Sequence, residues 1–215
     1  MIKPLIRTFI AISFPEEVVQ EIARVQSLVS NKKFIGKLTE LENLHLTLKF
    51  LGEISQEQLE KVIEQLEKIK FQKFQAKLLN IGLFNYEKSP KIVWIKVGSK
   101  SLAHADERSE SSQQDAAKEI ASNSRAKQFN IYELQKQIDE SLKDSFAPEQ
   151  RFMSHLTIAR IKHVSDKKEF TSSIEKIPVK QISFPLTSFK LLSSELKPLG
   201  PVYTTIKEFT SSNPC

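Results

Sequence analysis

Cysteine is almost absent from this chain of 215 residues, because its single cysteine, Cys215, is the last residue. No internal disulfide can form, and no cysteine-rich metal site is possible. Long apolar runs are also absent, since no stretch approaches the roughly 18 apolar residues that a membrane-spanning helix needs. Near the start, the apolar stretch runs only from Phe9 to Ile12, so we expect no signal peptide. These absences favour a cytoplasmic protein without membrane association.

The composition indicates a globular protein with a basic surface. Hydrophobic residues make up 40% of the chain and include 14 Phe, which is enough for a substantial core. Lys and Arg outnumber Asp and Glu by 32 to 26, which leaves a formal charge of +6. This charge favours an anionic partner such as RNA, although a merely basic soluble protein would show the same balance. Nothing in the sequence indicates oligomerisation, and we expect a monomer.

Periodicity predicts an α+β fold in which the two halves repeat one order of elements. Pro15 followed by two Glu opens a helix, and Ser55 to Gln58 has the pattern of a capping box. We expect helices at 15–30, from 55 to about 69, at 131–142 and at 166–174, and strands at 5–14, 44–51, 74–84, 91–97, 154–161, 179–192 and 202–209. Such a duplication would have approximate two-fold symmetry and would bring corresponding strands to a shared cleft.

Residues 99–127 interrupt this repeat. The segment is rich in Ser, Ala, Gln and charge, and Leu102 and Ile120 are its only large aliphatic residues. It cannot bury enough apolar surface to offset the entropy of ordering, so we expect a disordered surface insertion that leaves activity intact. His104 lies in this segment, and we expect no role for it. The sequence therefore predicts one bilobal domain over residues 1–209 and a tail at 210–215.

Two copies of one short pattern occur in strand-like runs, His45-Leu46-Thr47-Leu48 and His155-Leu156-Thr157-Ile158. Successive side chains of a strand point to opposite faces, so each His shares a face with the Thr two residues later. A single such histidine would more often be a core residue. Two among four histidines would arise by chance in only about one case in a hundred.

Two imidazoles and two hydroxyls suit chemistry on a phosphodiester. An unperturbed imidazole, with a pKa of about 6.5, is available in either protonation state near neutral pH. One can take a proton from water or a ribose hydroxyl, the other can protonate the leaving oxygen, and hydroxyls can hold the non-bridging oxygens.

The sequence gives little support to a metal or an organic cofactor. A catalytic zinc needs three protein ligands, and no His, Cys or carboxylate lies two to four residues after either motif histidine. The chain also lacks a P-loop and a dinucleotide-binding fingerprint. We therefore expect no metal and no cofactor.

The residues around the motifs add candidate contacts. Strict alternation after His45 predicts Lys49 on the same face and Phe50 on the core face. By the same rule Arg160 lies opposite His155 unless the strand twists or bulges. Lys49 and Arg160 are candidate phosphate contacts, as is Arg7. Candidates for stacking on a base, although strand aromatics are more often core residues, are Phe9, Trp94 and Tyr203.

These residues resemble the 2H phosphoesterases, which carry two His-x-Thr-x motifs. The likeness is strongest to the bacterial and archaeal RNA 2′,3′-cyclic phosphodiesterases, historically 2′-5′ RNA ligases, and extends from about residue 6 to residue 209 apart from the insertion. The blocks that carry it are Arg7-Thr8-Phe9-Ile10-Ala11-Ile12, His45-Leu46-Thr47-Leu48-Lys49-Phe50-Leu51-Gly52, His155-Leu156-Thr157-Ile158-Ala159-Arg160 and Gly200-Pro201-Val202-Tyr203.

The resemblance implies a bilobal α+β fold in which each lobe is an antiparallel sheet with outer helices and the motifs face each other across a cleft. It also implies metal-free hydrolysis of RNA or nucleoside 2′,3′-cyclic phosphates to 2′-phosphates. In that scheme His45 donates a proton, His155 accepts one, and Thr47 and Thr157 hold the phosphate. Two alternatives stay open: reversible 2′-5′ ligation of RNA ends such as tRNA halves, and a non-catalytic RNA-binding module.

Overall fold

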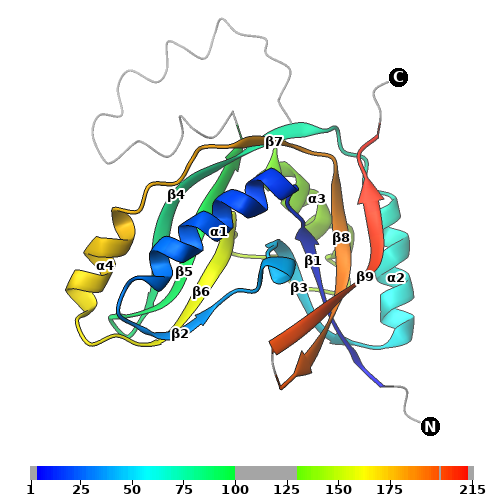
Figure 1. Cartoon of the computed structure of the whole chain (residues 1–215). Helices are drawn as coiled ribbons and strands as arrows, with labels where there is room; N and C mark the ends of the chain where they lie inside the picture. The colour runs from blue at the N-terminus through cyan, green and yellow to red at the C-terminus, as the bar shows by residue number, and fades with distance from the viewer. Residues whose placement is uncertain (1–3, 100–129, 199, 213–215) are drawn as a thin grey trace, which may run out of the picture.

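The computed structural model describes residues 4–198 and 200–212 except for 100–129, and it shows a curved antiparallel sheet packed with four α-helices (Figure 1). The elements in chain order are β1 (Ile6–Ile12), α1 (Glu16–Ser30), β2 (Ile35–Leu38), the 3-10 helix η1 (Leu41–Asn43), β3 (Leu46–Ile54), α2 (Gln56–Glu67), β4 (Phe74–Tyr86), β5 (Ser89–Ser99), α3 (Ile131–Leu142), β6 (His155–His163), α4 (Lys167–Glu175), β7 (Ser183–Leu186), β8 (Ser188–Lys197) and β9 (Gly200–Thr210).

The sheet order is β7-β4-β5-β6-β3-β1-β8-β9, with β2 added to β6. The two repeats exchange strands, because β5 of the first half pairs with β6 of the second, and β8 of the second half pairs with β1 of the first. Each lobe therefore contains chain from both halves. The lobes meet where β3 and β6 pair through Leu46 and Leu156, directly after the two motif histidines.

The helices pack behind the two lobes and bury the core. α1 contacts β6 and α4 contacts β4 and β5, whereas α3 contacts β3 and α2 contacts α3 and β9. In Figure 1, α4 and α2 consequently lie at opposite sides of the molecule. A separate small cluster of buried Phe9, Ala11 and Leu192, with Tyr203 packed against it, lies apart from the main core.

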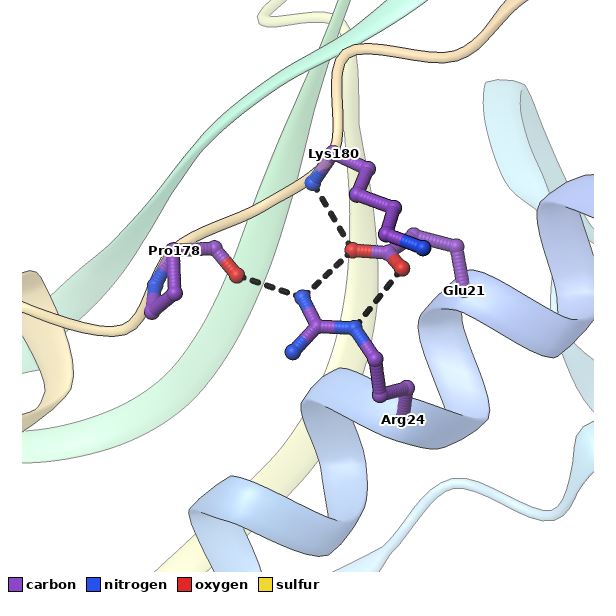
Figure 2. A network of polar contacts seen from close by, with 4 residues as sticks. All are labelled: Glu21, Arg24, Pro178 and Lys180. Atoms are coloured by element: carbon purple, nitrogen blue, oxygen red, sulfur yellow. Dashed lines mark hydrogen bonds and ion pairs between the residues drawn. The ribbon is translucent and has the colours of Figure 1, made fainter.

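A polar network around the buried Glu21 carboxylate fastens α1 to the chain between α4 and β7 (Figure 2). The Glu21 carboxylate accepts two hydrogen bonds from the Arg24 guanidinium, at 2.7 and 2.8 Å, and one from the Lys180 backbone N–H at 2.8 Å. Arg24 also donates to the Pro178 carbonyl oxygen at 2.6 Å. These bonds hold the pKa of Glu21 below its usual value although burial acts in the opposite direction. The network thus fixes where α1 lies on the sheet.

The α+β class, the antiparallel pairing and the repeated order that the sequence predicts are confirmed. The helix expected at 131–142 has those bounds, and Ser55 and Gln58 form the expected capping box. Three details differ: β2 was not expected, the strand expected at 179–192 is divided into β7 and β8, and the two lobes share one continuous sheet. The insertion with His104 lies outside the described residues. None of the described helices combines the length and apolar character needed to cross a membrane.

Candidate active site

One pocket of about 480 Å³ brings both sequence motifs together at the junction of the lobes. His45 immediately precedes β3, and His155 begins β6. The pocket is lined by Arg7, Phe9, Lys37, Leu38, Thr39, Glu40, Asn43, His45, Thr47, Phe50, Ile92, His155, Thr157, Arg160, Ser194, Pro201 and Tyr203. The two motifs are far apart in the chain but meet in space, because β3 and β6, the strands that carry them, lie side by side in the sheet.

The two histidines have the same backbone partner geometry. Nδ1 of His45 lies 2.7 Å from the Asn43 carbonyl oxygen, and Nδ1 of His155 lies 2.8 Å from the Met153 carbonyl oxygen, two residues earlier in each case. A carbonyl oxygen only accepts hydrogen bonds, so Nδ1 carries the proton in both rings. Nε2 is then the nitrogen that can take up or release a proton.

His45 lies in a more enclosed environment than a surface histidine. Its ring centroid is 4.9 Å from that of Phe9 and 5.2 Å from that of Tyr203. Burial lowers the pKa of the His45 imidazole, and the neighbouring Arg160 and His155 act in the same direction, whereas the hydrogen bond to Asn43 opposes them. These surroundings bias His45 toward the neutral form.

His155 has a different aromatic neighbour. Its ring packs at 4.9 Å and nearly perpendicular to Phe84 of β4. The two imidazoles are thus equivalent in backbone geometry but not in surroundings.

A β-bulge in each motif strand determines what else faces the pocket. In β3, Thr47 pairs with Ala11 and Lys49 with Ile10, which leaves Leu48 as an extra residue. In β6, Ile158 is extra in the same way, between Thr157 paired with Trp94 and Ala159 paired with Val93. An extra residue shifts the alternation of faces by one position. The residue five positions after each histidine therefore faces the pocket in place of the one four positions after.

The prediction that Lys49 shares the face of His45 is wrong for this reason. Lys49 is only 3% exposed and lies behind the strand, where its Nζ is 2.5 Å from Asp139 Oδ1 and donates to the Ala147 carbonyl oxygen at 2.7 Å. It does not line the pocket and is unavailable to a phosphate.

Phe50 takes the place that alternation assigned to Lys49. It is 64% exposed and lines the pocket, contrary to the expected core position. The corresponding residue of the second motif is Arg160, which the bulge brings to the same pocket as His155. The sequence predicted that Arg160 would share the face of His155 only if the strand twisted or bulged, and β6 has such a bulge.

The three candidate stacking aromatics are placed differently. Tyr203 lines the pocket and is half-buried, and burial raises the pKa of its hydroxyl. Phe9 lines the pocket but is almost fully buried beneath His45. Trp94 is not among the lining residues, since its ring packs against Gly82 and lies 5.3 Å from Phe84. The expectation that Trp94 stacks on a ligand is therefore not supported.

Several lining residues were not identified from the sequence. Most belong to residues 37–43, which reach the pocket because β2 pairs with β6 far along the chain. The β8–β9 hairpin reaches the same place, and Asn43 Nδ2 donates to the Pro201 carbonyl oxygen at 3.0 Å. Only Phe50 carried a signal, as a large aromatic in the motif block. Within the part of the chain that the structure describes, no group of three His, Cys, Asp or Glu is placed to hold a metal ion.

Comparisons with known proteins agree with this geometry. The family model described as LigT like Phosphoesterase matches residues 12–94 and again 123–203, one match for each repeat. A Methanocaldococcus jannaschii protein named RNA 2′,3′-cyclic phosphodiesterase is 33% identical over 94% of this chain and 99% of its own length. A Thermotoga maritima protein of the same name is 28% identical over 94% of both chains.

Solved structures with this fold include a Thermus thermophilus protein, with a TM-score of 0.70 and 24% identity over 95% of this chain and 97% of the other. Another is E. coli LigT complexed with 3′-AMP, with a TM-score of 0.64 and 19% identity over 98% of this chain and 100% of the other. At this level of identity the two structures establish the fold.

Proposed function

The chain belongs to the LigT-like phosphoesterase family, and from that premise we propose that it hydrolyses 2′,3′-cyclic phosphates on RNA ends or nucleosides to 2′-phosphates. The observation that carries the proposal is the pair of imidazoles, each with Nδ1 fixed on a backbone carbonyl, in one pocket. The relatives named RNA 2′,3′-cyclic phosphodiesterase support the choice of substrate.

The proposed reaction needs one base and one acid. His155 Nε2 takes a proton from a water molecule as the water oxygen attacks phosphorus. The bond from phosphorus to the 3′-oxygen breaks, and His45 Nε2 gives its proton to that oxygen. The product carries a 3′-hydroxyl and a 2′-phosphate. One proton has passed from water to His155, and another has passed from His45 to the 3′-oxygen. The resemblance to 2H phosphoesterases supports this assignment of the two roles.

Three further side chains of the pocket stabilise the negative charge on the phosphate. We propose that the Thr47 and Thr157 hydroxyls donate to the non-bridging oxygens, because each lies two residues after a histidine and lines the same pocket. The Arg160 guanidinium supplies a permanent positive charge for the same oxygens. Arg7 adds positive charge at the wall of the pocket, whereas the charge of Lys37 is balanced by its ion pair with Glu40 at 2.5 Å.

The nucleoside has an aromatic surface beside the histidines. Phe50 is the most exposed ring of the pocket, and Tyr203 is half-buried at its edge, so these two offer faces to a base. Phe9 is too deeply buried for stacking, and its contact with His45 instead supports the imidazole.

A bound phosphate changes the protonation of His45. The free pocket disfavours the imidazolium form because burial lowers the pKa. A phosphodiester brings one negative charge beside the ring, which favours the imidazolium. Substrate binding thus prepares His45 as the acid.

Reversible 2′-5′ ligation would use the same two imidazoles in the same roles, with an RNA hydroxyl in place of water as the nucleophile. A non-catalytic RNA-binding module is disfavoured, because both motifs contribute complete His and Thr pairs to one pocket.

The test is product analysis after incubation of the protein with a 2′,3′-cyclic nucleotide in EDTA. We expect the 2′-phosphate as the product and no effect of the chelator. A 3′-phosphate would contradict the assignment of the broken bond, and the absence of any product would contradict hydrolysis. A parallel incubation with tRNA halves that carry a cyclic phosphate measures joining of RNA ends in the same preparation.

A further inference from the structure

A second hollow, which we call the α4 groove, lies between the β4–β5 hairpin and α4, outside the candidate active site. Its volume is about 320 Å³, and it is lined by Asn85, Lys88, Pro90, Lys167, Lys168, Thr171, Ser172 and Glu175. No residue is shared with the catalytic pocket.

The α4 groove is positively charged. Lys88, Lys167 and Lys168 are all exposed, and in the described part of the chain no ion pair involves any of them. Lys167 and Lys168 begin α4, where the helix dipole disfavours cations. Glu175 is the only carboxylate among the lining residues. The Asp166 carboxylate already caps this terminus, where it accepts from the Glu169 backbone N–H at 2.8 Å, so an anion in the groove would chiefly offset the mutual repulsion of the lysines.

The backbone at Lys88 is unusual. Glu87 and Lys88 have φ of 49° and 59° at the tip of the hairpin, a conformation that suits Gly or Asn. Other residues adopt this region of φ rarely, and such backbone conformations are often retained at binding sites. Here that conformation places a lysine at the wall of the groove.

The α4 groove is connected to the catalytic pocket through two strands. Pro90 lines the groove and Ile92 lines the pocket, and the extra residue Lys91 between them places the two side chains on opposite faces of β5, close to its end. Along β6, Arg160 lines the pocket and Lys162 is exposed, after which the chain enters α4 at Lys167. Positive charge therefore runs along β6 from the pocket to the end of the sheet where α4 begins.

We propose that the α4 groove binds the phosphate backbone of the RNA strand whose terminal cyclic phosphate occupies the catalytic pocket. This inference rests on the proposed function. The three lysines neutralise phosphates, and the Thr171 and Ser172 hydroxyls donate hydrogen bonds to phosphate oxygens. RNA is favoured over an acidic protein because Arg160 and Lys162 carry positive charge along β6 from the catalytic pocket to the end of the sheet where α4 begins, and a strand leaving the pocket can follow it round that end. The groove makes an oligonucleotide a better substrate than a mononucleotide.

The test compares two substrates in a triple variant, Lys88→Asn, Lys167→Gln and Lys168→Gln. Asn tolerates the left-handed backbone at position 88, so the variant removes charge without adding strain. For an oligoribonucleotide that ends in a 2′,3′-cyclic phosphate, we expect KM at low salt to rise roughly tenfold and the salt dependence to weaken by about two in the logarithmic slope. For a 2′,3′-cyclic mononucleotide, we expect unchanged kinetics.

The control variant, Lys61→Gln, Lys70→Gln and Lys73→Gln, removes the same charge from exposed lysines in and after α2. In Figure 1, α2 lies on the opposite side of the molecule from α4. The control variant should leave both substrates unaffected. Unchanged oligonucleotide kinetics in the α4 groove variant, or an equal rise of KM in the control variant, would overturn the inference. The proposed function would still hold in either case if the mononucleotide is hydrolysed. No mononucleotide hydrolysis by the unmodified protein would instead overturn the proposed function.

Discussion

At the scale of single residues, His45 and His155 differ only in what surrounds their rings. Both hold Nδ1 on the carbonyl oxygen two residues earlier, so both present Nε2. His45 is enclosed by Phe9 and Tyr203, whereas His155 packs against Phe84. Because the geometry is symmetric, experiments rather than distances must distinguish the acid from the base.

The acid and the base can be distinguished with a substrate whose leaving group departs without being protonated. We expect His45→Ala to lower the rate on a 2′,3′-cyclic nucleotide by about 10²–10⁴-fold, as loss of a general acid does. On a p-nitrophenyl phosphodiester, the loss should be much smaller, because p-nitrophenolate departs unprotonated. His155→Ala should lower both rates, since water needs a base in either reaction. The reverse pattern, with His155→Ala rescued by the better leaving group, would exchange the two roles.

The pH dependence should report on the environment of His45. Burial lowers the pKa of its imidazole in the free protein, and an acid must be protonated to act, so activity falls as pH rises through this pKa. The high-pH limb of kcat/KM, which reports the free enzyme, should therefore lie below pH of about 6.5. The limb of kcat should lie at higher pH because bound phosphate favours the imidazolium. A kcat limb at equal or lower pH would speak against His45 as the acid.

Sequence spacing was sufficient to identify the His and Thr pairs as neighbours, because a period of two holds between positions 45 and 47 and between 155 and 157. It failed at Lys49 and Phe50, where the bulge at Leu48 shifts the faces. Nothing local in the sequence marks that bulge, since it depends on the register of β3 against β1.

At the scale of elements, each bulge is held by a helix of the opposite repeat. Gln26 of α1 is buried and donates to the Ile158 carbonyl oxygen at 2.9 Å and to the Thr39 carbonyl oxygen at 2.7 Å. Asp139 of α3 accepts from Lys49, which follows the bulge in β3, and from Gln135 at 2.6 Å. The helices therefore support the arrangement of the motif strands as well as covering the core.

We predict that Gln26→Leu lowers both stability and activity. The substitution leaves the Thr39 carbonyl without this partner and removes one donor from Ile158, which costs about 1–3 kcal/mol in the free energy of unfolding. Loss of that anchor also loosens the bulge that brings Arg160 to the pocket, so kcat/KM should fall. Denaturant unfolding and hydrolysis kinetics measure the two effects.

Glu21→Gln provides the matched control on the same helix. Glu21 is buried in the network of Figure 2, which does not touch a motif strand. This variant should lose stability but keep kcat/KM. Equal loss of activity in the two variants would show that Gln26 acts through general stability and not through the bulge.

The buried pair of Lys49 and Asp139 gives a second prediction at this scale. Lys49→Met leaves a buried carboxylate without its cation, so at pH 7 the free energy of unfolding should fall by about 3 kcal/mol. Burial alone would raise the pKa of Asp139. Its carboxylate accepts hydrogen bonds from Lys49, the Glu149 backbone and Gln135, and these bonds hold the pKa below its usual value. The stabilisation is therefore present above pH of about 4 and is lost as pH falls further.

Unfolding at a series of pH values measures this effect, and the difference between the two proteins should shrink below pH of about 4. Lys143→Met, which removes an exposed partner of Glu140 on the same helix, serves as the control and should change stability little. A pH-independent difference for Lys49→Met would contradict the role assigned to the ion pair.

Local signals predicted most elements. The capping box at Ser55 and the apolar faces of the helices depend on neighbours in sequence, and both are present in the structure. β2 has only four residues and pairs with β6 more than a hundred residues later, so no local pattern could reveal it.

At the scale of the whole molecule, the exchange of strands between repeats makes the pocket a property of the complete chain. Neither half contains the sheet that surrounds its own motif, because β5 pairs with β6 and β1 with β8. We therefore propose that residues 1–209 form a single bilobal domain whose halves would not be active alone. The duplication was visible in the sequence, but the exchange was not, since long-range pairing leaves no periodic trace.

The proposed function requires that His45 and His155 act together on one phosphoryl group. Its most direct test is turnover of a 2′,3′-cyclic nucleotide to the 2′-phosphate by the double variant His45→Ala and His155→Ala, with His163→Ala as a control for an exposed histidine at the far end of β6. We predict no turnover above the uncatalysed rate for the double variant and unchanged kinetics for His163→Ala. Sustained turnover by the double variant would contradict the joint role of His45 and His155.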